Sequence, residues 1–89
     1  MEINQRFMIK NVLGLHARAA ASFVKIANRY QATIEVEKDG MTVNGKSIMG
    51  VLMLAAAKGS EIGVRAAGDD AEDAMEALGP LIEDKFREK

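Results

Sequence analysis

Four stretches of this 89-residue chain alternate apolar and polar side chains, and this alternation limits the folds open to it. The stretches cover residues 2–10, 32–38, 41–43 and 60–67. Each predicts a strand with one buried and one exposed face, because successive side chains of a strand point to opposite sides. Such strands favour a mainly antiparallel sheet with helices on one side only, since the strands of a parallel sheet are usually apolar throughout.

Between these strands the apolar residues recur at helical spacing. Residues 17–29 predict an amphipathic helix, because their apolar side chains fall on one stripe. Residues 47–57 predict a shorter helix, which Gly59 is expected to end. Asp39-Gly40 predicts a tight hairpin between the second and third strands.

A third helix is expected after the last strand. Asp69 or Asp70 should cap its N-terminus, and Gly79-Pro80 predicts a kink or a break within it, because proline removes a backbone hydrogen bond. Its apolar stripe comprises Ala74, Met75, Leu78, Leu81, Ile82 and Phe86. The order β-α-β-β-α-β-α predicts a single α+β domain over residues 1–89. This domain would be an open-faced β-sandwich, a four-stranded sheet with three helices on one side.

The composition excludes several classes of protein. The chain has no cysteine, which excludes disulfides and thiolate metal sites. Its first residues lack the pattern of a secretory signal, and no stretch approaches the roughly 20 apolar residues that cross a bilayer. These features predict a cytoplasmic protein without a membrane segment. A net charge of −1 and few aromatic residues argue against nucleic-acid binding.

The charges are unevenly distributed along the chain. Residues 1–60 carry eight Lys or Arg against four Asp or Glu, whereas residues 61–89 carry four against nine. The acidic part is typical of a solvated helix face. The basic part would suit docking to acidic partner surfaces through electrostatic attraction.

The only histidine, His16, lies in the run Gly14-Leu15-His16-Ala17-Arg18, where the first helix is expected to begin. A helix N-terminus attracts phosphate, because its first N–H groups are unpaired and the helix dipole adds positive potential. Imidazole is not a favoured cap, and one histidine without cysteine falls short of a usual zinc site. The positive helix end also favours a neutral ring, whose nitrogen lone pair can attack phosphorus. The run therefore predicts a phosphoryl acceptor at His16, with Arg18 holding the transferred group.

These residues resemble the HPr phosphocarrier family of the phosphoenolpyruvate-dependent sugar phosphotransferase system. The hallmark of that family is a Gly-Leu-His-Ala-Arg run that opens the first helix, found here at residues 14–18. Residues 44–50, Asn-Gly-Lys-Ser-Ile-Met-Gly, match its regulatory serine region. The resemblance covers nearly the whole chain and agrees with the expected order of elements.

The resemblance implies a phosphoryl carrier rather than an enzyme with its own turnover. His16 would accept the group from phosphorylated enzyme I and pass it to enzyme IIA domains, with Arg18 as its electrostatic partner. No cofactor or metal is implied, and a monomer is expected. Ala19 departs from the family, which usually has proline there. Because proline fixes the backbone angle of the first turn, we expect a slightly less rigid start of the helix and an altered transfer rate.

Ser47 is expected to cap the second helix. By resemblance it is also the target of an HPr kinase/phosphorylase, and its phosphate would repel acidic partners. Two methionines fall off the core stripe of this helix and would form an adaptable apolar patch. The residues expected to bind partners are Ala20, Lys46, Met49 and Met53.

Two other functions are compatible with parts of the sequence. A regulatory paralogue in a nitrogen-related phosphotransferase branch would use the same histidine chemistry. Residues 40–47 also fit the P-loop pattern G-x-x-x-x-G-K-S of nucleotide hydrolases. However, Met41-Thr42-Val43 after an Asp-Gly turn are typical of a hairpin strand rather than of a loop that wraps phosphate.

Overall fold

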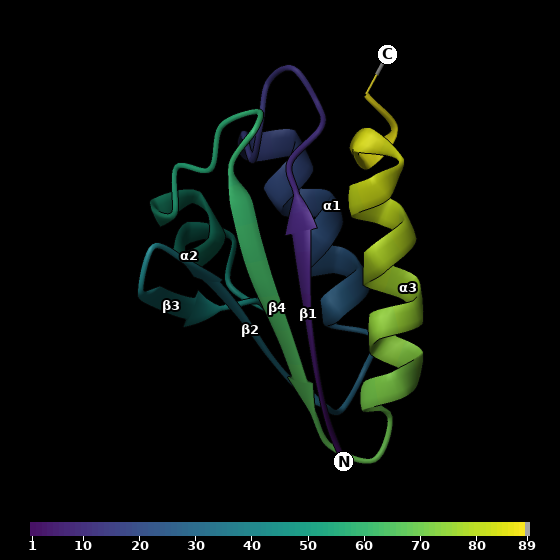
Figure 1. Ribbon diagram of the computed structural model, residues 1–89. Helices are drawn as coiled ribbons and strands as arrows, with labels where there is room; N and C mark the ends of the chain where they lie inside the picture. Colours follow the sequence, from purple (N-terminus) through teal and green to yellow (C-terminus); the bar gives the residue numbers. More distant parts are fainter. Residues whose placement is uncertain (89) are drawn as a thin grey trace.

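The computed structural model describes residues 1–88 and contains one four-stranded sheet. Its strands are β1 (Glu2–Met8), β2 (Thr33–Lys38), β3 (Met41–Asn44) and β4 (Glu61–Ala67). They lie in the order β1-β4-β2-β3, and every pairing is antiparallel (Figure 1). The antiparallel sheet predicted from the alternating pattern is therefore confirmed.

Three α-helices lie on one side of this sheet: α1 (Ala17–Ala27), α2 (Ile48–Met53) and α3 (Ala71–Glu83) (Figure 1). Helix α3 packs against β1, β4 and α1, and α2 packs against α1 and β3. A short turn, Lys85–Arg87, follows α3. The order of elements and the α+β open-faced sandwich agree with the prediction. Within residues 1–88, no helix combines the length and apolar character needed to cross a membrane.

The core lies between the sheet and the helices. In β2 and β4 every second side chain is buried, as the alternating pattern predicts. The largest fully buried apolar side chains come from both layers and from the loop after β1: Phe23, Ile9, Ile34, Ile62, Leu78, Ile82, Val36, Val51 and Val64. Because the helices cover only one face, the other face of the sheet is left to solvent.

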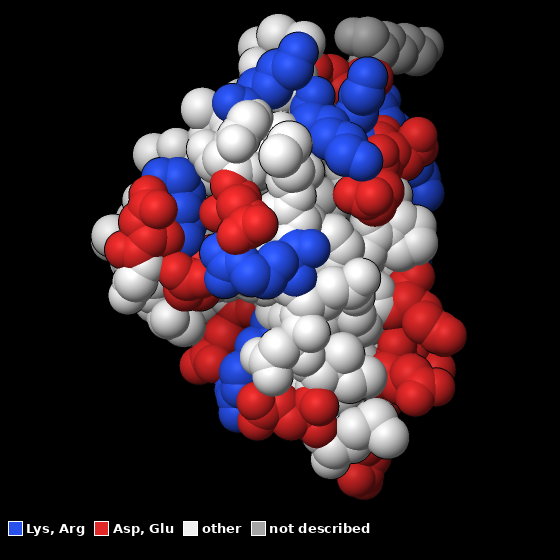
Figure 2. All heavy atoms as spheres, in the orientation of Figure 1, with Lys and Arg blue, Asp and Glu red and all other residues white. Residues whose placement is uncertain are grey.

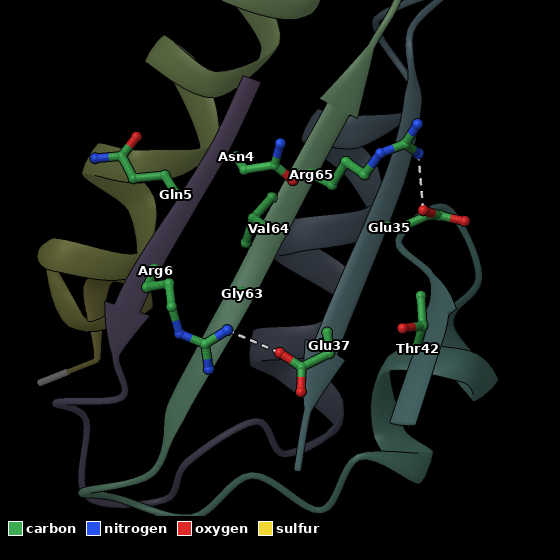
Figure 3. Close-up of a pocket in the computed structure, with 9 residues that line it drawn as sticks. All are labelled: Asn4, Gln5, Arg6, Glu35, Glu37, Thr42, Gly63, Val64 and Arg65. Carbon is green, nitrogen blue, oxygen red and sulfur yellow. Dashed lines mark hydrogen bonds and ion pairs between the residues drawn. The ribbon is translucent and has the colours of Figure 1, made fainter. Parts of the chain in front are cut away.

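Ion pairs cross the open face of the sheet. Arg6 of β1 donates through Nη1 to Glu37 of β2 at 2.8 Å (Figure 3). It also donates through Nε to Glu61 of β4 at 2.7 Å. Its guanidinium passes over Gly63 of β4, where a Cβ would lie 2.9 Å from Nη1. The missing side chain of Gly63 therefore opens the path by which Arg6 reaches a strand that is not its neighbour.

Arg65 of β4 makes a second set of contacts on this face. It donates to Glu35 of β2 at 2.8 Å and to Glu2 of β1 at 3.0 Å. The hydrogen bond from Arg65 lowers the pKa of Glu2 to about 2, so this carboxylate is charged at neutral pH. Exposed ion pairs of this kind stabilise a fold only slightly. The hollow shown in Figure 3 is thus lined by charges that neutralise one another.

Acidic side chains gather along α3, at the right of Figure 2. Glu72, Asp73, Glu76 and Glu83 of this helix are all exposed, whereas most of its apolar residues are buried. The acidic part of the sequence therefore forms a solvated helix face. The solvated helix face predicted from the acidic residues is therefore observed.

Helix α2 is shorter than predicted, and Gly59 does not end it. The helix stops at Met53, because Ala55 takes a left-handed backbone conformation with φ 49°. Glycine is the usual residue at such a position, since a Cβ disfavours positive φ. Gly59, with φ 91°, lies instead in the turn before β4. The apolar periodicity of the sequence continues beyond the observed end of the helix. The turn that ends the helix is formed at an alanine, a residue type that does not mark a helix end in the sequence.

Helix α3 begins after Asp70, one of the two predicted cap residues, and Gly79-Pro80 does not break it. It runs through Pro80 without a break, and the N–H of Asp84 still donates to the Pro80 carbonyl at 2.8 Å. Asp70 occupies the N-cap position, but its side chain makes no capping hydrogen bond. Its carboxylate accepts instead from the backbone N–H groups of Gln31 and Ala32, both at 2.8 Å. Asp70 thus fixes the start of β2 to the start of α3.

Three predicted element ends also lie beyond the observed ones. Strand β1 ends at Met8, although the buried Ile9 still exchanges backbone hydrogen bonds with Gly59 and Ser60. Helix α1 ends at Ala27 rather than at residue 29. Phe86, predicted on the stripe of α3, is buried but lies in the turn after that helix.

Candidate phosphoryl-acceptor site

The loop before α1 is held by a close backbone approach. Gly14 has φ 68°, and the N–H of Leu15 donates to the carbonyl of Ala56 at 2.8 Å. A Cβ on Gly14 would lie 2.4 Å from that same carbonyl oxygen. Only glycine fits this conformation and this contact together. The loop thereby fixes where the next residues, and with them His16, enter the helix.

Asn11 supports the same loop from inside. Its side chain is fully buried, and its Nδ2 donates to the Gly14 carbonyl at 2.7 Å and to Oε2 of Glu88 at 3.0 Å. Both N–H bonds of the amide are thus used. The residue joins the loop before α1 to a residue at the far end of the described chain.

His16 is the N-cap residue of α1, as the sequence predicted. Its backbone is extended, with φ −78° and ψ 179°, and its carbonyl accepts the N–H of Ala20 at 2.8 Å. The N–H groups of Ala17, Arg18 and Ala19 precede this bond, so they have no partner within the helix. The His16 side chain makes no capping hydrogen bond and is 29% exposed. Its ring is therefore accessible beside unpaired amides, as a phosphoryl acceptor requires.

A carboxylate that the sequence did not indicate faces the ring. Oε2 of Glu88 lies 3.7 Å from Nε2 of His16. The Glu88 side chain also accepts hydrogen bonds from the N–H groups of Val12 at 2.8 Å and Leu13 at 3.4 Å. The hydrogen bond from Asn11, then those from Val12 and Leu13, lower the pKa of Glu88. This carboxylate is consequently ionised at neutral pH.

Two arginines line the hollow around His16. One is Arg18, which was predicted, and the other is Arg87, which was not. Within residues 1–88 neither arginine forms an ion pair, so both charges are available to an anion. The hollow is lined by Leu13, His16, Ala17, Arg18, Ala19, Phe86, Arg87 and Glu88. Unpaired helix amides and two arginines make this hollow suited to a phosphoryl group.

The turn that supplies Glu88 and Arg87 has an unusual backbone. Lys85, Phe86 and Arg87 are left-handed, with φ of 55°, 55° and 60°. This conformation costs an L-residue roughly 1–2 kcal/mol. Phe86 is 7% exposed, and its burial offsets part of that cost. No glycine or asparagine marks this turn, so nothing in the residue types predicts that the chain folds back here.

Ser47 caps α2 as predicted: its Oγ accepts the N–H of Gly50 at 3.0 Å. Met49 and Met53 are 71% and 64% exposed, so they are surface residues rather than loosely packed core. Together with Ile48, which is 42% exposed, they form an apolar surface on α2. We call these three residues the α2 patch.

Two of the residues expected to bind partners have structural roles. Ala20 is fully buried, so its side chain is not available to a partner and that prediction is wrong. The residue faces inward because it lies on the buried stripe of α1. Lys46 is half-buried, and its Nζ donates to the Tyr30 carbonyl at 2.6 Å. This contact anchors the segment before Ser47.

The P-loop reading of residues 40–47 is not supported by their structure. Gly40 lies in the hairpin turn, and Met41–Asn44 form β3, which pairs with β2. The segment is thus a strand where a P-loop would wrap phosphate with its backbone. Among residues 1–88, no three His, Asp or Glu side chains gather as a metal site.

Comparisons with known proteins agree with this geometry. A family model described as "PTS HPr component phosphorylation site" matches residues 3–84. The chain is 43% identical over 86 residues to the phosphocarrier protein HPr of Xylella fastidiosa, with 97% of each chain covered. It is also 40% identical over 83 residues to the HPr-like protein Crh of Bacillus subtilis, covering 93% of this chain and 98% of that protein. The crystal structure of HPr-C-His from Thermoanaerobacter tengcongensis has a TM-score of 0.94 and 47% identity, with 98% of each chain covered.

Proposed function

Since this chain belongs to the HPr family of phosphotransferase-system phosphocarriers, we propose that it carries the phosphoryl group on His16. It would receive the group from phosphorylated enzyme I and pass it to an enzyme IIA domain. The observation that carries this proposal is an accessible imidazole at the N-cap of α1, beside N–H groups that have no partner in the helix. The protein is then a substrate of its partner enzymes and needs no deep cleft of its own.

The proposed transfer follows from the groups around the ring. A ring nitrogen of neutral His16 attacks phosphorus with its lone pair, a P–N bond forms, and the bond to the donor breaks with its electron pair. The phosphoryl oxygens then face the first-turn amides of α1 and the guanidinium groups of Arg18 and Arg87. Because the hollow is open to solvent, the group is held without being enclosed. It can therefore be passed on.

Ala19 is compatible with this role. It is 1% exposed and packs in the first turn of a regular helix, so the absence of proline does not disrupt the start of α1. Alanine is the best helix former among the ordinary residues. We therefore expect any effect of Ala19 on the rate of transfer rather than on the ability to accept the group.

The proposal is tested by incubating the protein with phosphoenolpyruvate and enzyme I and measuring its intact mass. We expect a gain of one phosphoryl group that is labile in acid, as phosphohistidine is, and no gain in His16→Ala. Ser47→Ala is the matched control and should be phosphorylated as the unchanged protein is. A phosphoryl group that persists in His16→Ala, or no gain at all, would contradict the proposal.

The branch of the system is a separate question, because a nitrogen-related paralogue would use the same chemistry. The α2 patch is the exposed apolar surface that would meet an enzyme IIA domain. Transfer from the phosphorylated protein to sugar-specific and to nitrogen-branch enzyme IIA domains should be timed side by side. We propose the sugar branch, and faster transfer to the nitrogen-branch domain would support the alternative.

A cytoplasmic location and a monomeric state also belong to this proposal. Sedimentation of the purified protein tests the monomeric state.

Regulation at Ser47 is proposed on the position of its hydroxyl. Ser47 is half-exposed, begins α2 and directly precedes the α2 patch. A phosphate there would add nearly two negative charges beside the surface used for docking. With HPr kinase/phosphorylase and ATP, we expect one phosphoryl group that is absent in Ser47→Ala. The modified protein should accept the His16 phosphoryl group at least about tenfold more slowly. An unchanged rate would rule out this mode of regulation.

A further inference from the structure

One edge of the sheet is open along β1. Within residues 1–88, β4 is the only strand that pairs with β1. Ile9, just after β1, exchanges two backbone hydrogen bonds of 2.8 Å with the turn before β4. Because successive residues of a strand direct their backbone groups to opposite edges, those of Asn4, Arg6 and Met8 point away from β4. This row of donors and acceptors can pair with a further strand.

A groove lies beside this open edge, between β1 and α3 (Figure 1). Its lining comes from both elements and includes Phe7, Met75, Glu76, Gly79, Pro80 and Glu83. The apolar residues among these lie in the middle of the groove, and the two glutamates belong to its α3 wall. The groove shares no lining residue with the hollow around His16. It is therefore a separate feature of the surface.

Gly79 keeps the middle of the groove open. Glycine destabilises the interior of a helix relative to alanine. A Cβ on Gly79 would nevertheless lie 3.5 Å from the ring of Phe7, which is an ordinary contact. Packing within the protein therefore does not require a glycine here. The glycine eases the helical backbone before Pro80, and it also leaves room for a side chain from outside.

The α3 wall of the groove is acidic. Glu72, Glu76 and Glu83 fall on the same face of the helix as Gly79, because these four residues are spaced three or four apart. All three glutamates are exposed, and no Lys or Arg occurs in α3. Figure 2 shows the acidic side chains of this helix beside uncharged surface. Glu83 is paired with Lys10 at 3.2 Å, so Glu72 and Glu76 contribute most to the attraction of a basic group.

We propose that this groove binds an extended segment of a partner protein, which adds to β1 as a further strand and has the pattern basic-x-apolar-x-basic. Alternate side chains of a strand share one face and lie about 6.8 Å apart. Along the axis of α3, Glu76 and Glu83 lie about 4.5 and 6 Å from Gly79. An apolar side chain that enters the groove at Gly79 thus places a basic side chain near each glutamate. The backbone of the segment bonds to the open edge of β1.

A second copy of this chain fits the groove less well than such a segment. Two copies that paired through β1 would form one continuous antiparallel sheet, with the helices of both on the same side. The two α3 helices would then lie next to each other across the junction. Because both helices are acidic, their charges would repel. Charge therefore favours a basic partner.

The first test titrates a synthetic peptide into the ¹⁵N-labelled protein. The probe is Thr-Lys-Thr-Ile-Thr-Lys-Thr, acetylated and amidated at its ends. We expect the amide signals of Asn4, Arg6 and Met8 and those along α3 to shift, and the signals of the α2 patch to stay in place. The same peptide with glutamate in place of both lysines should bind at least about tenfold more weakly. N-methylation of its three central residues, which removes backbone donors, should abolish the shifts in β1.

The second test changes one charge in the groove. Glu76→Lys should weaken binding of the lysine peptide by about fivefold, because an attraction between exposed charges becomes a repulsion. Asp84→Lys is the matched control. Asp84 directly follows α3, but it lines a hollow beside α1 and not the groove, so this charge reversal should alter the affinity by less than about twofold. Both positions are exposed, so both variants should give the spectrum of a folded protein.

Each of the other outcomes would overturn the inference. Equal binding of the lysine and glutamate peptides, or equal affinities of Glu76→Lys and Asp84→Lys, would show that the acidic wall selects no partner. Shifts confined to the α2 patch, or no shifts at millimolar peptide, would show that the groove is not a docking site for such a segment. Shifts in β1 that appear on raising the protein concentration without peptide would show that a second copy occupies the open edge.

Discussion

Replacing Gly14 by alanine is expected to destabilise the protein by about 3–6 kcal/mol, through three separate effects. Residue 14 has φ 68°, where a side chain costs roughly 1–2 kcal/mol. The new Cβ would meet the Ala56 carbonyl oxygen at 2.4 Å, and overpacking of this kind costs about 1–3 kcal/mol. Relief of that clash would lengthen the bond from Leu15 N–H to the same oxygen, a loss of about 1 kcal/mol. Urea unfolding followed by circular dichroism measures the sum.

Gly40→Ala is the matched control, because it isolates the backbone contribution. Gly40 has φ 85° but would bring its Cβ within 4 Å of nothing. We therefore expect a loss of only about 1–2 kcal/mol, which is the conformational cost alone. Equal losses in Gly14→Ala and Gly40→Ala would show that the contact between residue 14 and Ala56 yields easily. In that case the loop would not fix the position of His16 in the way described.

The sheet could be predicted from the sequence because a half-buried strand alternates apolar and polar residues. In β2 one face lies in the core, so the buried Ile34 and Val36 alternate with Glu35 and Glu37. The limits of the elements were predicted less well. Helix α2 ends where Ala55 adopts a left-handed conformation, and nothing in the type of that residue signals the turn. Tertiary contacts determined it, among them the hydrogen bond from Leu15 to Ala56.

The candidate site shows the same division between local and distant information. His16 and Arg18 could be predicted, because residues adjacent in the sequence determine where a helix begins. Glu88 and Arg87 could not, since they reach the site only after α3 crosses the domain and the chain turns back with left-handed residues. The prediction that Ala20 binds a partner was wrong for a related reason. A shift of one position along a helix decides whether a side chain faces a partner or the core.

Replacing Arg18 by methionine is expected to slow phosphoryl transfer to His16 by about 10- to 100-fold. Arg18 is exposed, lines the hollow around the ring and has no ion-pair partner among residues 1–88. Its guanidinium is therefore free to bind the oxygens that gain charge in the transition state. One such charge-assisted hydrogen bond contributes about 1.5–3 kcal/mol, and each 1.4 kcal/mol corresponds to roughly a tenfold change in rate. Rapid-quench measurement of transfer from phosphorylated enzyme I gives the rate.

The size of the effect should depend on position and not only on charge. Arg29→Met removes an equal charge just beyond the other end of α1, so it should change the rate by less than about threefold, and added salt should abolish that difference. Arg18→Met should stay slow in salt and at saturating donor, because the missing interaction belongs to the transition state rather than to docking. If the two variants were equally slow, or if saturating donor restored Arg18→Met, then Arg18 would act by attracting the partner. Arg87 and the amides of α1 would in that case be the groups that hold the phosphoryl oxygens.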